Sequence, residues 1–196
     1  NALAALYLTN ATSIVISMTS VLGGGSVFSK TISLAAVPLD PAWWAWFYGT
    51  KIAPTQSVSV DLPSYVDGII TVTISGGTSL AVGVLMIGQQ RAFGVGIQYG
   101  ARVGIQDYSR KEKNDFGDTV LVERAFAKRA NFDLILEKFE TDQLQNFLAE
   151  IRATNALWIG SDEYESTIIF GFYKSFDILI SYPTRSDCSL EIEGLT

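Results

Sequence analysis

The sequence predicts a mainly β protein with two domains, a β-sandwich over residues 1–90 and a split β-barrel or sheet domain with one packed helix over residues 91–196. Short segments rich in Val, Ile, Ser and Thr alternate apolar and polar side chains, which is typical of half-buried strands. Charge is distributed unevenly, since residues 1–90 contain only two of the 14 basic and three of the 20 acidic side chains. This change in composition predicts a domain boundary near "IGQQRAFGVG".

Four segments of the first domain are predicted to be strands, because they are rich in β-branched residues and separated by turn residues. They are "SIVISMT" (13–19), "VFSKTISL" (27–34), "VSVDL" (58–62) and "IITVTIS" (69–75). The glycines of "GGG" (23–25) and "SGG" (75–77) are expected at hairpin or loop tips. Asn10, Thr12 and Ser13 interrupt the apolar N-terminal run before the roughly 20 residues needed to span a bilayer, so no membrane segment is expected.

The second domain is predicted to contain a hairpin and several further strands. "RVGIQDYSRKE" and "TVLVERAFAKR" flank "NDFGD", whose Asn, Asp and Gly suit a hairpin turn. Strands are also expected at 130–139, 156–160, 166–182 and 188–195. Lys174, Ser175 and Asp177 interrupt the third of these, so it is expected to bend or to change sheet there.

One segment has the periodicity of a helix. In "TDQLQNFLAEIRAT", the apolar side chains fall at i, i+3, i+4 and i+7, at Leu144, Phe147, Leu148 and Ile151. Thr141 is the predicted N-cap, because its hydroxyl can accept a hydrogen bond from the first turn. The sequence therefore predicts a helix over about residues 141–153 that packs its apolar stripe on a sheet.

Composition argues against several classes of function. A net charge of −6 and a pI near 4.6 disfavour binding to nucleic acid or to an anionic membrane face. The chain has no histidine, which excludes histidine-dependent catalytic triads and removes the commonest zinc ligand. Its single cysteine, Cys188, allows no intrachain disulfide and is expected to be a buried apolar side chain. No catalytic residue, cofactor or metal ligand is predicted.

Two acidic segments have alternative interpretations. Asp162, Glu163 and Glu165 are expected in a solvated loop, and the alternative is a cation site, because calcium takes oxygen ligands from such loops. Glu191 and Glu193 share one face of a predicted strand and are expected to be its solvent side.

The densest aromatic cluster is the stretch "AWWAWFY". As a strand it would direct Trp44, Trp46 and Tyr48 to one side and Trp43 and Phe47 to the other. One of these faces is expected in the core of the sandwich. The other is predicted to contact the second domain, a neighbouring protein or a sugar ring, since Trp and Tyr suit all three settings.

Basic side chains cluster on both arms of the predicted hairpin. They are Arg110, Lys111 and Lys113 in "SRKEK", and Arg124, Lys128 and Arg129, together with Phe126, in "ERAFAKR". A charged hairpin is normally a solvated surface. The alternative is contact with a neighbouring subunit, because mixed charged and aromatic content suits an oligomer better than a catalyst.

Several motifs resemble a known family. "QYGARVGIQDYSRKEKNDFGD", "ERAFAKR", "LAEIRATNALWIG", "FYKSFDILISYPT" and "CSLEIEGL" resemble the C-terminal domain of tail proteins of long-tailed bacteriophages, over most of residues 91–196. "WFYGTK", "VDLPSY" and "IITVTISGG" followed by "VGVLMIG" resemble the jelly-roll, carbohydrate-binding-like (galactose-binding-like) module that precedes it. The combination is similar to distal tail proteins, which are tail-tip or baseplate components.

The resemblance implies a structural role in the virion, without catalytic residues or cofactors. The expected partners are copies of the chain in a ring beneath the tail tube, and neighbouring tail-tube, hub or fibre proteins. The alternative is a carbohydrate-binding adhesin module that recognises a host-surface glycan, with Trp43, Trp44, Trp46 and Tyr48 as the candidate contacts. No nucleic acid and no membrane insertion are expected.

Overall fold

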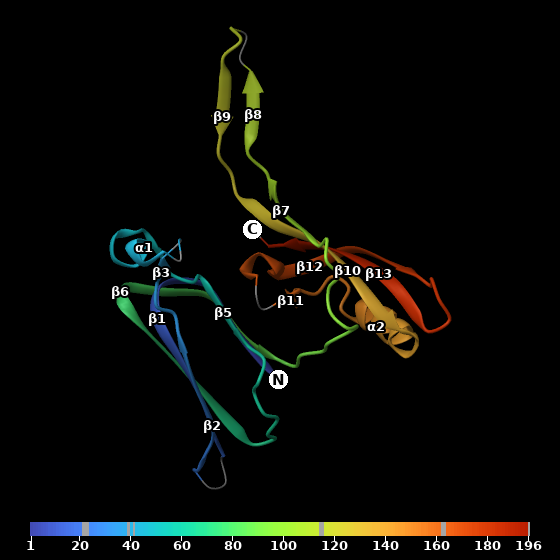
Figure 1. Ribbon diagram of the computed structural model, residues 1–196, viewed down its shortest axis with the longest axis horizontal. Coiled ribbons are helices and arrows are strands. Elements are labelled where there is room, and N and C mark those ends of the chain that lie inside the picture. Colours follow the sequence, from blue (N-terminus) through green and yellow to red (C-terminus); the bar gives the residue numbers. More distant parts are fainter. Residues whose placement is uncertain (21–23, 39, 41, 114–115, 162–163, 196) are drawn as a thin grey trace. The chain divides into compact units, whose positions relative to one another are not determined.

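The computed structural model describes residues 1–20, 24–38, 40, 42–113, 116–161 and 164–195 (Figure 1). Of the described residues, 59% lie in strands and 12% in helices, so the predicted mainly β class with a packed helix is confirmed. The chain divides into two compact units, Asn1–Arg91 and Ala92–Thr196.

The first unit is built around two long strands. Its elements are β1 (Ala2–Ser20), β2 (Ser26–Ser33), β3 (Val37–Pro38), α1 (Trp43–Tyr48), β4 (Lys51–Ile52), β5 (Gln56–Ser59) and β6 (Gly68–Gly88). β6 runs antiparallel to β1 from one end to the other. On the opposite side of β1, β5 pairs with residues 3–6 and β2 with residues 13–19.

The β1–β6 ribbon folds over on itself. Tyr7 and Asn10 of β1 have φ values of 55°, a left-handed conformation that turns the strand sharply. Because Thr9 pairs with Ala81 and Ala11 with Gly76, residues 77–80 of β6 lie opposite Asn10 alone, which lengthens the outer strand at the corner. The result is a sandwich of two three-stranded layers, β6–β1–β5 and β6–β1–β2.

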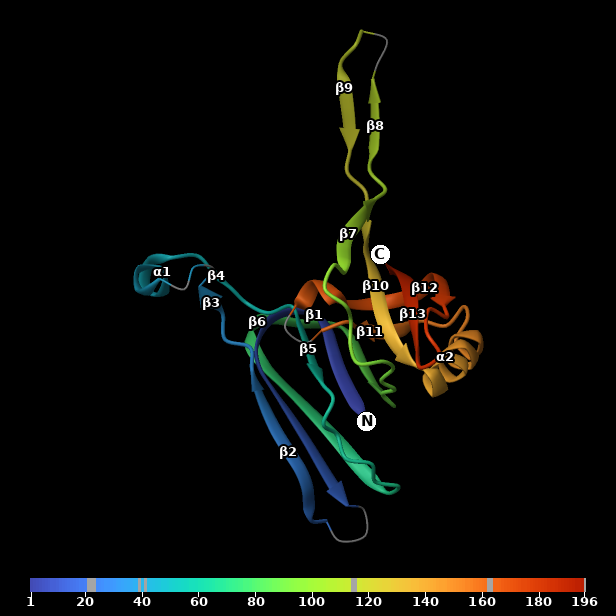
Figure 2. The same cartoon turned by 45° about the vertical axis from the view of Figure 1, so that its right-hand side comes forward.

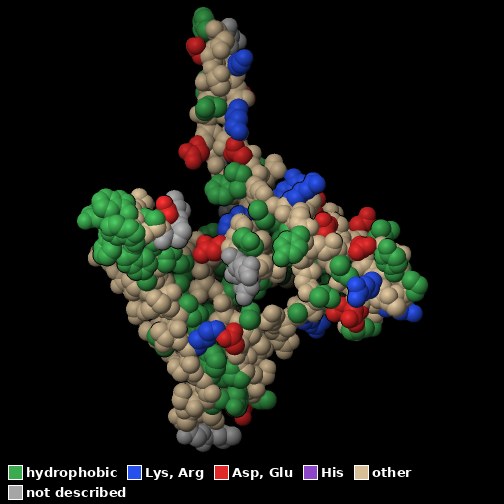
Figure 3. Space-filling model, in the orientation of Figure 1, with side chains coloured by type: hydrophobic (Ala, Val, Ile, Leu, Met, Phe, Trp, Pro, Cys, Tyr) green, Lys and Arg blue, Asp and Glu red, His purple; other side chains and the backbone are tan. Residues whose placement is uncertain are grey.

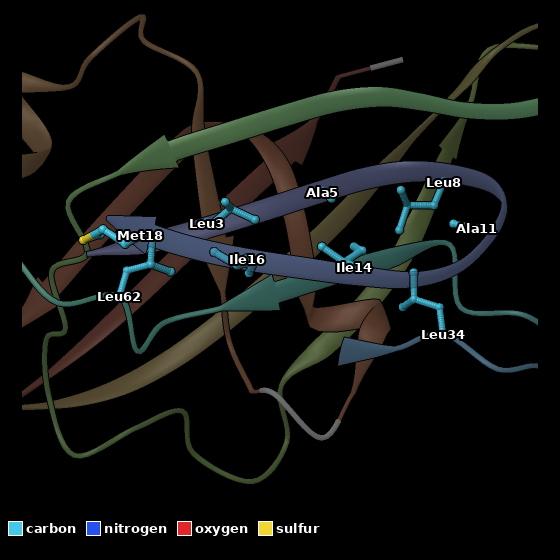
Figure 4. Packing of buried hydrophobic residues seen from close by; sticks show 9 residues of the cluster. All are labelled: Leu3, Ala5, Leu8, Ala11, Ile14, Ile16, Met18, Leu34 and Leu62. Carbon is cyan, nitrogen blue, oxygen red and sulfur yellow. The ribbon is translucent and has the colours of Figure 1, made fainter. Parts of the chain in front are cut away.

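The core of this unit lies between the two arms of β1. Figure 4 shows Leu3 and Ala5 on one arm facing Ile14 and Ile16 on the returning arm, with Leu8 near the bend. Every one of these side chains is buried. The alternation of apolar residues along β1 therefore supplies both walls of one small core.

The first unit differs from the sequence predictions mainly in the length of its strands. β1, β2 and β6 overlap the strands predicted over residues 13–19, 27–34 and 69–75, and β1 and β6 extend far beyond them. The strand predicted over residues 58–62 is only partly right, because β5 ends at Ser59. The prediction of a loop tip at residues 75–77 is wrong, because this segment lies inside β6. Gly24 and Gly25 do lie in the connection from β1 to β2, whereas Gly23 is outside the described residues. The jelly-roll topology is not confirmed.

The second unit is one antiparallel sheet with a helix on it and a separate hairpin. Its elements are β7 (Arg102–Asp107), β8 (Arg110–Lys113), β9 (Thr119–Val122), β10 (Phe126–Glu137), α2 (Lys138–Glu150), β11 (Ala156–Ile159), η1 (Glu165–Thr167), β12 (Ile168–Leu179) and β13 (Arg185–Gly194). The order in the sheet is β11–β12–β13–β10–β7. The interruption predicted at Lys174 and Ser175 is a β-bulge, since Tyr173 pairs with Ile192 but Ser175 with Glu191.

The helix packs as its periodicity predicts, but it begins earlier. Leu144 and Leu148 are buried against Phe132, Leu136 and other core residues of the sheet. The N-cap is Glu137 instead of Thr141, and it forms a capping box with Glu140. The helix ends at Glu150 instead of residue 153.

Candidate interaction surfaces

The aromatic stretch forms a short helix at the end of a two-stranded stalk. β3 and β4 pair through Val37 with Ile52 and Pro38 with Lys51, and α1 lies in the chain between them (Figure 2). Before the helix, the Ala42 N–H donates to Asp40 Oδ1 at 2.9 Å. We call residues 37–52 the α1 arm.

The predicted strand and its buried aromatic face are wrong. No residue of α1 is buried, and the side chains of the cluster are 56–72% exposed, namely Trp43, Trp44, Trp46, Phe47 and Tyr48. Helical spacing explains the arrangement, because positions i and i+4 are neighbours and the Trp44 and Tyr48 ring centroids lie 4.3 Å apart. Hydrophobic side chains gather over α1 in Figure 3.

The rings of the α1 arm do not form one flat platform. The Trp43 and Trp44 rings meet edge to face at 88°, with centroids 5.9 Å apart. Lys51 Nζ lies 5.9 Å from the centroid of the Trp46 ring, at the distance of a cation–π contact. A knob of rings in several orientations fits an apolar protein pocket better than the face of a single sugar ring.

The predicted basic interface lies on and beside the β8–β9 hairpin, but several of its charges are paired within the chain. Arg110 contacts Glu112, Lys111 Nζ lies 2.8 Å from Asp107 Oδ2, and Arg129 Nε lies 3.1 Å from Glu191 Oε1. The Lys111 contact, together with hydrogen bonds from Ser109, holds the pKa of Asp107 below its ordinary range. Three of the predicted interface cations therefore already form ion pairs within the chain.

The other predicted interface residues are spread over β8, the segment between β9 and β10, and β10. Lys113 is exposed on β8, and Arg124 lies between β9 and β10, where its backbone N–H donates to Ser109 Oγ at 3.1 Å. On β10, Phe126 is exposed and Lys128 is half-buried. The structure thus places the seven residues along one hairpin and its base rather than in a single cluster.

Sequence reasoning missed the apolar character of β9. Val120, Leu121 and Val122 are all exposed, as is Tyr108 at the base of the hairpin. An uncharged "TVLV" opposite a charged "RKEK" was the available signal, because a strand that faced only water would carry more polar side chains. The hairpin consequently offers apolar contacts as well as charge.

Glu191 and Glu193 lie opposite the helix-bearing face of the sheet, but they are partnered. Glu191 accepts from Ser175 Oγ at 3.2 Å and contacts Lys174 and Arg129. Partial burial opposes its ionisation, but the two cations outweigh this effect and hold its pKa below the ordinary value. Tyr108 donates its hydroxyl to Glu193 Oε1 at 2.8 Å, which raises the Tyr108 pKa. Glu191 thus links β13 to its neighbours β12 and β10, and Glu193 links β13 to the end of β7.

The alternative of a cation site has no support in the described part of the chain. Asp162 and Glu163 lie outside the described residues, and Glu165 begins η1. Within residues 1–20, 24–38, 40, 42–113, 116–161 and 164–195, no group of three or more His, Cys, Asp or Glu side chains could hold a metal ion.

Of the helices described, none is long and apolar enough to cross a membrane.

Cys188 lies in the core of the second unit, as predicted, and should be chemically inert in the folded protein. Burial, together with the charges of Asp133 and Asp177, raises the pKa of its thiol to about 11. Because the thiolate is the reactive form, we expect no alkylation by iodoacetamide of the folded chain at about pH 8, and complete alkylation in denaturant. Mass spectrometry reads this directly, since the chain has one cysteine. Rapid labelling of the folded chain would contradict the described burial.

No protein-family model matches this chain, and no curated protein matches it.

Proposed function

We propose that the chain is a structural subunit that works by association with copies of itself and with other proteins, at the tail tip or baseplate of a long-tailed bacteriophage particle. The arrangement that the resemblance implies is a ring of copies beneath the tail tube. The expected neighbours are tail-tube, hub or fibre proteins.

The observation that supports this proposal most directly is the exposure of the α1 arm. Five aromatic side chains within the six residues of α1 face solvent at the end of a stalk, and no charged residue separates them. Trp and Tyr are enriched where protein surfaces meet, and a contiguous apolar patch on a soluble domain usually marks such a contact. The apolar β9 strand adds a second surface of the same kind.

A carbohydrate-binding adhesin is the second candidate, and the exposure of Trp43, Trp44, Trp46 and Tyr48 is the observation that favours it. Exposed aromatic rings stack on sugars through their apolar faces. The different ring orientations weigh against it, because a glycan would meet the rings one at a time.

The two candidates separate in one set of variants. Trp43→Ala, Trp44→Ala and Trp46→Ala should each change the free energy of unfolding by less than about 0.5 kcal/mol, since exposed side chains contribute little to stability. We expect the same substitutions to weaken association measured by native mass spectrometry, while Tyr65→Ala, an exposed aromatic residue elsewhere in the unit, leaves it unchanged. A glycan array is probed with the same proteins.

Three results would count against the structural proposal. The first is a parent chain that stays monomeric at every concentration and binds a glycan. The second is a glycan signal that disappears in the tryptophan variants while the mass distribution stays the same. The third is strong destabilisation by any one of the three substitutions, which would mean that the α1 arm is part of a core.

A further inference from the structure

β6 has a free edge along its whole length. Among the described residues it pairs only with β1, so its other side presents unpaired backbone N–H and C=O groups. The strand spans Gly68–Gly88 and has 21 residues, none of them buried. Its sequence, "GIITVTISGGTSLAVGVLMIG", contains no charged residue and no proline.

This composition is unusual for an edge strand. Soluble proteins protect long edges with lysine, proline or inward-pointing charge, because an apolar edge is a template for pairing with another strand. The other edges of the same sandwich follow that rule: Lys30 of β2 pairs with Asp61, just beyond β5, and also donates to Ser59 Oγ at 3.3 Å. On β6 the only interruption is the corner at residues 77–80, which divides the edge into two arms.

The second arm of β6, residues 81–88, leaves core-type side chains uncovered. Ile87 pairs with Leu3 and Leu85 with Ala5, so both point to the face on which Leu3 and Ala5 are buried. Nevertheless Leu85 is 48% and Ile87 52% exposed. The apolar face of this layer thus extends past its last strand, as it would if a further strand belonged beside it.

We infer that this edge pairs with β6 of a second copy of the chain, antiparallel, through residues 81–88. The occupant follows from the proposed self-association, and charge indicates where the copies can meet. Two copies of a chain with net charge −6 repel each other over most of their surface, whereas β6 has no charged residue, so two β6 strands can approach without bringing like charges together. We expect β6 to pair with β6, because the other edges of the sandwich, at β2 and β5, carry the charged Lys30–Asp61 pair.

The pairing is two-fold symmetric and closes as a dimer, with residue i of one copy opposite residue j of the other and the reverse. It extends two β6–β1–β5 layers into one sheet and covers Leu85 and Ile87 in both copies. The inference rests on the proposed self-association, for which it names the surface. A ring built from such dimers needs a second contact, and the α1 arm and the β9 strand remain available for it.

The test is the mass of the full chain with charge placed on β6. Leu85→Lys combined with Ile87→Lys should weaken dimerisation about a hundredfold, because opposed strands would then carry like charges. Both side chains are half exposed, so the fold should hold. The matched control is Ser29→Lys combined with Thr31→Lys, which adds the same charge at exposed positions of β2. Native mass spectrometry and hydrogen exchange of peptides from residues 68–88 are recorded for all three proteins.

The expected result is loss of the β6 contact in the β6 variant alone: its complexes are smaller than those of the parent and the β2 control, and protection of β6 amides rises with concentration in the parent but not in the variant. A β6 variant that associates as the parent does would overturn the inference, while the proposed function would stand if the α1 tryptophan variants then disrupt the assembly. A monomeric parent with protected β6 amides would also overturn it, because a segment of the same chain would then cover the edge. A monomeric parent with unprotected β6 amides would remove both this inference and the proposed self-association.

Discussion

Replacing Leu148 by aspartate is expected to destabilise the unit formed by residues 92–196 strongly. The Leu148 side chain is fully buried between α2 and the sheet, among Phe132, Leu136 and Leu144. A carboxylate there has no partner and must either stay charged without water or take up a proton, at a cost of about 4–5 kcal/mol. Since a domain is stable by only about 5–15 kcal/mol, this cost removes between about a third and all of the free energy of unfolding.

The measurement is hydrogen exchange resolved by peptide, because the two units need not unfold together. We expect β10 and β13 to lose protection in Leu148→Asp while β1 keeps it. Gln145→Asp is the matched control, since it adds the same charge on the exposed side of the same helix and should shift stability by less than about 1 kcal/mol. A Leu148→Asp chain with parental protection in β13 would show that α2 does not pack as described.

The second large effect is expected from Gly76→Ala, at the corner of the folded ribbon. A Cβ atom on Gly76 would lie 2.2 Å from the backbone oxygen of Asn10 and 3.1 Å from the Cα of Ala11. These are backbone atoms at the bend of β1, and they cannot move aside as a flexible side chain would. We expect a loss of about 2–3 kcal/mol in the stability of the first unit, as for other overpacked sites.

Gly77 supplies the control for this prediction, because a Cβ atom added there meets no atom within 4 Å. Gly77→Ala should therefore melt close to the parent, although it is the adjacent residue in the same strand. The comparison is made by thermal unfolding and by hydrogen exchange of peptides from β1. Equal stability of the two variants would mean that the ribbon does not close tightly at Gly76.

The sequence predicts which segments form helices or strands better than it predicts which segments pack or pair with one another. The stripe that contains Leu144 and Leu148 identifies α2 because four apolar positions fit one helical period. Its N-cap was missed because Glu137 is not a usual capping residue, and the preceding strand continues directly into the helix. Local pattern thus gives the element, whereas its first residue depends on the capping box with Glu140.

The folded ribbon could not be predicted from local pattern. Asn10, Thr12 and Ser13 interrupt the apolar N-terminal run, and "SGG" suggests a turn, yet β1 and β6 run through both. The bend depends on left-handed φ values at Tyr7 and Asn10, and Tyr in particular gives no sequence signal for that conformation. Which strands pair is set by contacts between residues far apart in the chain.

The α1 arm shows a different limit. The expectation that one aromatic face of this stretch lies in the core followed from strand alternation and from the large apolar surface of the rings, which is the usual reason for burial. An apolar side chain is expected to be covered, but its hydrophobicity does not indicate whether the same chain or another protein covers it. The stalk formed by Val37, Pro38, Lys51 and Ile52 holds the rings away from the sandwich core, and two-residue strands leave almost no sequence pattern.

The pairing of β1 with β6, the first and last strands of the first unit, sets the order of events during synthesis. The β6–β1–β2 layer needs residues 68–76 of β6, whereas the β6–β1–β5 layer, in which Ala2 pairs with Gly88, cannot be completed until residue 88 has left the ribosome. Until β6 emerges, β1, with its buried leucines and isoleucines, has only β2 and β5 to cover it. Contacts this distant in sequence slow folding and prolong the exposure of unpaired strands. A nascent chain of this protein therefore passes through an interval in which its most apolar strand is open to other chains, and its yield should depend on how quickly translation reaches β6.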